Sequence, residues 1–172
     1  MARVSTRENK NIYQLTRENL KLTRETASEL LESIPPERIE KIENERSFPH
    51  PDGVLTMAEK YKKPDLCNYY CANQCPIGQE YVPEVKIKDL SQIVLEMLAS
   101  LNAMNKRKDR LIEITADGKI SDDELEDFLY IQEELERISI TVETLQLWAE
   151  KMLAAGVIDE ARYEAYRSRK KT

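Results

Sequence analysis

The chain has 172 residues, long enough for one compact domain or for a small domain joined to a helical extension. Hydrophobic residues make up 41% and charged residues 34%, with only four glycines and two phenylalanines, a composition that favours an all-α fold over a β-sandwich. No apolar run reaches the length of a membrane span, and the first residues lack the apolar stretch of a signal peptide. We therefore expect a cytoplasmic protein with no membrane partner.

The net charge of −6 speaks against a generic nucleic-acid binder, but the charge is unevenly spread along the chain. Residues 1–63 hold 12 Lys and Arg against 11 Asp and Glu, a net charge of +1. Residues 121–160 hold 2 against 12, a net charge of −10, and residues 161–172 hold 5 against 1. The acidic charge therefore sits in the C-terminal half, and its distribution is more informative than its sum.

Four short helices are predicted in the front third of the chain, over residues 12–22, 23–32, 37–45 and 54–63. Thr23 has the side chain of a residue that caps the start of the second helix. Pro36 suits the first turn of the third helix, where its missing N–H costs nothing. Residues 47–53 contain five turn-forming residues, Ser47, Pro49, Pro51, Asp52 and Gly53, and are predicted to form a loop.

Residues 64–86 differ in composition from the flanking segments, with three cysteines, several tyrosines and prolines. We predict a small helical domain over residues 1–63, a cysteine-containing connector over residues 64–86, and a C-terminal helical hairpin with a short terminal helix over residues 87–172. Apolar residues in the hairpin recur in steps of four and three, the pattern of a coiled coil. The two seams are Leu90, Val94, Met97, Leu101, Met104 and Leu111, then Phe128, Ile131, Leu135, Ile138, Val142, Leu145, Ala149 and Met152.

A helix-ending Gly118 and a capping Ser121, with Glu124 three residues later, predict the turn between the two arms. Further apolar residues widen each stripe beyond a two-stranded contact. They are Ile93, Leu98, Ile112, Leu129, Leu147 and Leu153. We expect a second copy to cover them, giving a homodimer with a four-helix bundle and two recognition helices paired on a two-fold axis. The alternative cover is the helix over residues 159–169, folded back with Tyr163 and Tyr166.

The front third of the chain also meets the demands of a DNA-binding helical domain: a small residue where two helices cross, apolar residues on the inner face of the third helix, and polar groups facing outward. The residues concerned are Arg17, Leu22, Thr23, Arg24, Glu25, Ala27, Ser28, Ile39, Ile42, Glu43, Asn44, Pro49, Leu55, Thr56, Met57 and Ala58. This set resembles the Cro and lambda-repressor-like (XRE-type) helix-turn-helix family. The resemblance implies a helix-turn-helix domain before the hairpin. It also implies that the protein is a transcriptional regulator that binds double-stranded DNA, and not an enzyme.

The resemblance also implies roles for single residues. Thr23 and Arg24 would hold a phosphate at the start of the second helix, and Asn44 would make a further contact with the DNA backbone. The outer or leading face of the recognition helix would consist of Pro36, Glu37, Arg38, Glu40 and Lys41. Arg38 and Lys41 are the strongest candidates for contacts with bases or phosphates.

Two further groups complete this interpretation. Arg17 and Glu43 occupy the positions of an internal ion pair in the family. An N-terminal arm with Arg3, Arg7 and Lys10 would reach the neighbouring groove.

Three departures from the family pattern favour an alternative. The turn before the recognition helix is one residue longer than usual, Glu45 replaces a common C-terminal glycine, and Glu37 and Glu40 place carboxylates where phosphates approach. In the alternative, the helix-turn-helix surface and the acidic hairpin bind protein.

Cys67, Cys71 and Cys75 are spaced by four residues, and three thiolates are suitable ligands for zinc or an iron–sulfur cluster. A further hypothesis is therefore that the cysteines form a metal or redox sensor that sets the DNA affinity. However, eight residues of unbroken helix would hold Cys67 and Cys75 about 12 Å apart. Ordinary free cysteines with no cofactor are the alternative. Residues 113–124 also partly match a calcium loop, but a capped turn explains the same residues. One histidine and no glycine-rich phosphate loop give no catalytic site.

Overall fold

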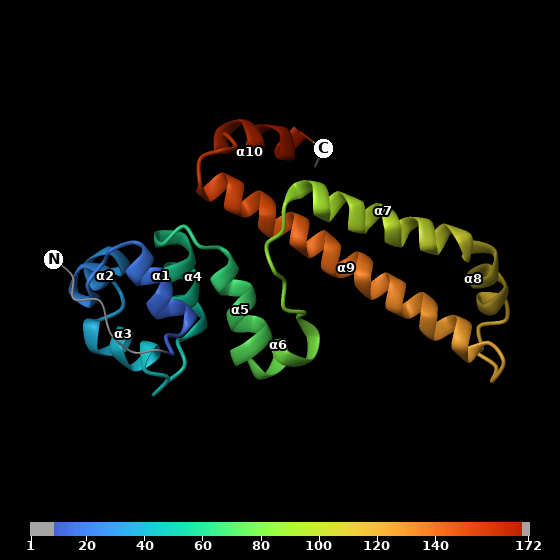
Figure 1. Ribbon diagram of the computed structural model, residues 1–172, viewed down its shortest axis with the longest axis horizontal. Coiled ribbons are helices and arrows are strands. Elements are labelled where there is room, and N and C mark those ends of the chain that lie inside the picture. Colours follow the sequence, from blue (N-terminus) through green and yellow to red (C-terminus); the bar gives the residue numbers. More distant parts are fainter. Residues whose placement is uncertain (1–8, 170–172) are drawn as a thin grey trace. The chain divides into compact units, whose positions relative to one another are not determined.

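The computed structural model describes residues 9–169. Over this range the chain folds into helices and loops with no strand, which confirms the all-α prediction (Figure 1). The chain divides into two compact units, one made of residues 1–84 with 149–172 and one made of residues 85–148. Among the helices described, none combines the length and the apolar character needed to cross a membrane.

Six short helices form the front of the first unit: α1 (Ile12–Asn19), α2 (Arg24–Leu31), α3 (Pro36–Glu43), α4 (Pro51–Lys60), α5 (Asp65–Gln74) and α6 (Pro76–Tyr81). The local signals in the sequence set several of their ends. Thr23 caps α2 with its side chain accepting from the Thr26 N–H, and Pro36 occupies the first turn of α3. The loop before α4 is shorter than predicted, because Pro51 already begins the helix.

The core of this unit is a cluster of apolar side chains contributed by all of the first five helices. Tyr13, Ala27, Ile39, Met57 and Leu66 are each at most 2% exposed. Because Leu66 of α5 is fully buried in this cluster, the cysteine-containing segment is part of the domain core and not a simple connector. Gly78 of α6 lies so close to the Cys71 carbonyl oxygen of α5 that no side chain would fit between the two helices.

Each of the first four helices ends at a non-glycine residue with a positive φ, and α1, α3 and α4 share the same closing hydrogen bonds. Lys21, Glu45 and Lys62 have φ angles of 58°, 57° and 52°. At each of these ends two backbone N–H groups bond back to carbonyls of the last turn, such as Arg46 N to the Lys41 oxygen at 2.9 Å. These bonds satisfy the last carbonyls of each helix at the expense of backbone strain.

The second unit is a hairpin in which α7 (Leu90–Lys106) and α8 (Lys108–Thr115) run antiparallel to α9 (Leu125–Ala154), as Figure 1 shows. The first arm is therefore two helices and not the single helix predicted. The break falls at Arg107, whose guanidinium lies 4.0 Å from the ring centroid of Tyr130 and bonds Asp127 at 2.8 Å. The helix α10 (Glu160–Arg169) follows and buries none of its residues.

The turn of the hairpin has the predicted glycine but only half of the predicted capping box, because α9 begins at Leu125 and Ser121 lies in the turn before it. Gly118 has a φ of 71°, and the Glu124 carboxylate accepts from the backbone N–H of Ser121 at 3.0 Å. The seam, however, differs from the prediction. The buried positions are Ile93, Ser100, Ile114, Ile131, Glu134, Thr141, Thr144 and Leu147, whereas Leu90, Val94, Leu101, Leu135 and Val142 of the predicted seams are exposed. Each helix thus packs on a face beside its most apolar stripe.

Candidate nucleic-acid interface

The helix pair α2 and α3 is joined by a four-residue turn, residues 32–35. On α3, Ile39 and Ile42 point into the core, each at most 3% exposed. Glu37, Arg38 and Lys41 of the same helix are exposed. The helix therefore presents a charged outer face on a buried apolar base, as the sequence pattern predicted.

A buried ion network fixes α3 to the two preceding helices. The Glu43 carboxylate is 1% exposed and accepts from Nε and Nη2 of Arg17, the latter at 3.0 Å, and from Nε of Arg24 at 2.9 Å. Arg17 is 7% exposed and also donates to the Leu22 carbonyl oxygen. The predicted Arg17–Glu43 ion pair is confirmed, and Arg24 is an additional member of the network. One carboxylate thus holds α1, the start of α2 and the end of α3 together.

The start of α2 is the predicted phosphate site. Here the Thr23 N–H donates to the Thr26 hydroxyl at 2.9 Å and the Thr23 hydroxyl accepts from the Thr26 N–H. The N–H and the hydroxyl of Thr23 are therefore both engaged in capping α2. The Glu25 carboxylate lies at the same helix end, where hydrogen bonds from its own N–H and from the Thr23 hydroxyl hold its pKa below the usual value. An anionic side chain thus occupies the end of the helix that a phosphate would approach.

The outer face of α3 makes few contacts with the rest of the domain. Arg38 donates from Nη2 to the Phe48 carbonyl oxygen at 3.0 Å, which ties it to the loop after the helix. Glu40 accepts from Asn44 at 3.4 Å. Lys41 is fully on the exposed side and Pro36 is half-buried at the first turn. Arg38 and Lys41 therefore project from the same short helix, with acidic neighbours beside them.

Other predicted contacts are placed differently. The Lys10 ammonium forms an ion pair with Glu18 at 2.7 Å and is 15% exposed, so it is fastened to α1 and is not part of a free arm. Arg3 and Arg7 lie outside the described residues. Three neighbours of the interface were not assigned from sequence: Glu25, Arg46 and Phe48. Arg46 and Phe48 are exposed in the loop after α3, and their position after the predicted recognition helix was the available signal.

The three cysteines are free thiols that are half-buried on α5 and at its end. Burial, then the neighbouring Cys71, Glu150 and Asp65, raise the pKa of Cys67, which disfavours the thiolate that a metal requires. Between residues 9 and 169, no group of three or more His, Cys, Asp or Glu side chains is placed to hold a metal ion.

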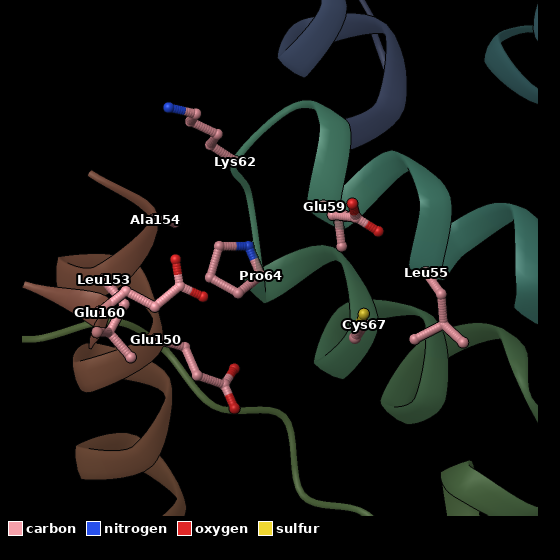
Figure 2. A pocket seen from close by; sticks show the side chains of 10 residues that line it. Leu55, Glu59, Lys62, Pro64, Cys67, Glu150, Leu153, Ala154 and Glu160 are labelled. Carbon is pink, nitrogen blue, oxygen red and sulfur yellow. The ribbon is translucent and has the colours of Figure 1, made fainter. Parts of the chain in front are cut away.

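An open pocket of about 670 Å³ lies in the first unit beside Cys67 (Figure 2). Its lining is Leu55, Ala58, Glu59, Lys62, Pro64, Cys67, Glu150, Leu153, Ala154 and Glu160. The lining contains three carboxylates and a single ammonium group, so it does not favour an anionic ligand.

No protein-family model, no curated protein and no solved structure matches this chain. The function proposed below therefore rests on the residues and the geometry of this chain alone.

Proposed function

We propose that the protein is a transcriptional regulator that binds double-stranded DNA through its helix-turn-helix domain, with α3 as the recognition helix. The observation that carries the proposal is the division of α3 into two faces. Ile39, Ile42 and Glu43 fasten its inner side, whereas Arg38 and Lys41 extend from its outer side. A short helix held rigidly with basic groups outward is the element that enters a major groove.

Separate residues would carry affinity and specificity. Arg38 has a planar guanidinium that suits the O6 and N7 acceptors of guanine, and Lys41 can meet a base or a phosphate. Arg24 uses Nε for Glu43 and remains about a third exposed (32%), so its terminal nitrogens are oriented by the network for a phosphate contact. Asn44 at the end of α3 would add a contact with the DNA backbone.

The proposal is tested by selecting bound fragments from a random duplex pool with the full chain, followed by affinity measurement at several salt concentrations. We expect enrichment of one sequence and an affinity that falls steeply with salt, because Lys and Arg displace counterions from phosphates. Arg38→Ala should cost about 1–3 kcal/mol and relax the preference at one base pair. Lys41→Ala should weaken binding and lower the salt slope by about 1 if it contacts a phosphate.

Lys60→Ala is a matched control, because Lys60 is also an exposed lysine near a helix end but belongs to α4. Its DNA affinity should be unchanged. An unenriched pool, or equal losses for Lys41→Ala and Lys60→Ala, would contradict the proposal.

A second candidate function is a protein-binding adaptor that uses the same surface. The Glu25 carboxylate at the start of α2 is the observation that favours it, together with exposed Glu37 on α3. These carboxylates repel phosphates and suit a basic partner surface. The fragment selection separates the two functions, because an adaptor enriches no DNA sequence.

A further inference from the structure

The hairpin of the second unit leaves large apolar side chains on its surface. Six of these exposed side chains form one stripe on each of two helices, and each of the six is between 39% and 52% exposed: Leu90, Val94, Leu98 and Leu101 on α7, and Leu135 and Val142 on α9. Meanwhile α9 buries polar residues, among them Glu134, Thr141 and Thr144. The hairpin contact is therefore not the surface for which the most apolar stripes are suited.

Helix geometry shows where these stripes point. Successive residues are rotated by about 100°, so the exposed stripe of α7 lies roughly 100° round the helix from buried Ile93 and Ser100. On α9, Leu135 and Val142 lie roughly 100° from the centre of the buried positions, in the same rotational sense along the chain. Because the two helices are antiparallel, equal senses bring both stripes to the same side of the hairpin. They form one continuous surface, which we call the apolar side.

The apolar side carries almost no charge. Residues 90–105 contain one charged side chain, Glu96, which Lys88 holds at 2.7 Å and which lies on the other side of Ile93. The neighbours of Leu135 and Val142 on this side of α9 are uncharged: Gln132, Ser139 and Gln146. Within the part of α9 that belongs to this unit, residues 125–148, the exposed carboxylates share the opposite side with Leu129 and Ile140. They are Glu126, Glu133 and Glu136.

We propose that the apolar side binds the apolar side of a second copy of this chain, and that the two hairpins form a four-helix bundle. In such a bundle each helix contacts two neighbours in directions about 90° apart. The rotation of roughly 100° between the buried and the exposed stripes matches this requirement on both helices. A symmetric contact between two copies brings identical surfaces together, and here it opposes no like charges. A basic partner would instead bind the opposite side of α9, which carries the exposed carboxylates and which we call the acidic side.

This inference concerns the hairpin alone and does not rest on DNA binding. Leu135 and Leu129 provide a matched pair for its test, because both are leucines of α9, 52% and 49% exposed, on opposite sides of the buried stripe. Leu135→Glu places a charge in the proposed interface, whereas Leu129→Glu adds the same charge to the acidic side. Sedimentation velocity on the full chain measures the association, and circular dichroism measures the helix content.

We expect a dimer for the wild-type chain at micromolar concentration, a dimer for Leu129→Glu, and a dimer dissociation constant raised at least about 100-fold for Leu135→Glu. If Leu135→Glu loses helix content, Leu98→Glu on α7 makes the same comparison. A monomeric wild-type chain, a dimeric Leu98→Glu variant, or equal dissociation of the Leu135→Glu and Leu129→Glu variants overturns the proposal.

Discussion

Glu25 is the side chain at the start of α2 that opposes the proposed phosphate contact. Its carboxylate accepts from its own N–H and from the Thr23 hydroxyl, so it takes the partial positive charge at the start of α2 for itself. A phosphate at the same helix end would compete for these donors and would meet a like charge. The residue therefore opposes the contact that Thr23 and Arg24 were predicted to make.

Removing that charge should strengthen DNA binding. We expect Glu25→Gln to raise the affinity by a few-fold at moderate salt, since an exposed like charge close to a phosphate repels it and solvent screens part of that repulsion. Fluorescence anisotropy with the selected duplex measures the change. Glu59→Gln, which removes an exposed carboxylate from α4, is the control and should leave the affinity unchanged. An affinity for Glu25→Gln at or below that of the wild type would show that no phosphate binds at this helix end.

Glu45 is a second residue whose local chemistry conflicts with its position. Its φ of 57° is strained for a residue with a Cβ, whereas glycine adopts it readily. Glu45→Gly should therefore stabilise the first unit by about 0.5–1 kcal/mol, and Glu45→Ala should give no gain. Hydrogen exchange of the α3 amides measures the difference. Slower exchange in both variants would assign the effect to the lost charge and not to the backbone.

The three helices around Glu43 depend on that one carboxylate for their mutual position. Glu43→Gln should destabilise the first unit by about 3 kcal/mol, because it leaves the buried Arg17 charge with only Glu18, 3.9 Å away, as a counter-ion. Arg24→Ala should cost about 1 kcal/mol or less, since Arg24 is a third exposed. Hydrogen exchange of α1 to α3 is the suitable measurement, because the single Trp148 belongs to the hairpin unit. Similar losses in both variants would contradict a central role for Glu43.

Element ends were predictable from the sequence because their signals are local. Thr23, Pro36 and Gly118 each determine the backbone within one helical turn, and the structure has all three where predicted. The Ser121–Glu124 pair forms, but α9 begins only at Leu125. Local signals could not predict which face of each hairpin helix is buried. Their apolar stripes are wide, and the choice of which part contacts the neighbouring helix depends on the whole assembly of helices.

The candidate site shows the same limit. The Arg17–Glu43 pair follows from two positions in a known pattern, and the structure confirms it. The engagement of Arg24 by Glu43, of Lys10 by Glu18 and of Arg38 by a loop carbonyl depends on side-chain rotamers and on segments distant in sequence. Periodicity and composition contain no information on such contacts. Glu25 was part of the recognised pattern, but the effect of its carboxylate at the start of α2 was not predicted.

For the molecule as a whole, the charge distribution limits how tightly one copy can hold DNA. Residues 1–63 have a net charge of +1 and residues 121–160 a net charge of −10, so the electrostatic gain comes from a few groups around α3. A single domain with this charge should bind a half-site weakly. Two linked domains gain affinity without any new contact, because the second binding step becomes intramolecular.

A palindromic site should therefore distinguish the dimer from the monomer. We expect the wild-type chain to bind a duplex with two half-sites at least about 100-fold more tightly than a duplex with one. Leu135→Glu should lose this advantage and bind both duplexes equally, at the half-site affinity of the wild type, because the substitution lies on the hairpin and leaves α3 untouched. Leu129→Glu should keep the advantage. Titrations of both duplexes at one salt concentration measure it. If Leu135→Glu retains the preference for two half-sites, then the DNA itself or another surface couples the two copies, and the hairpin has a separate task.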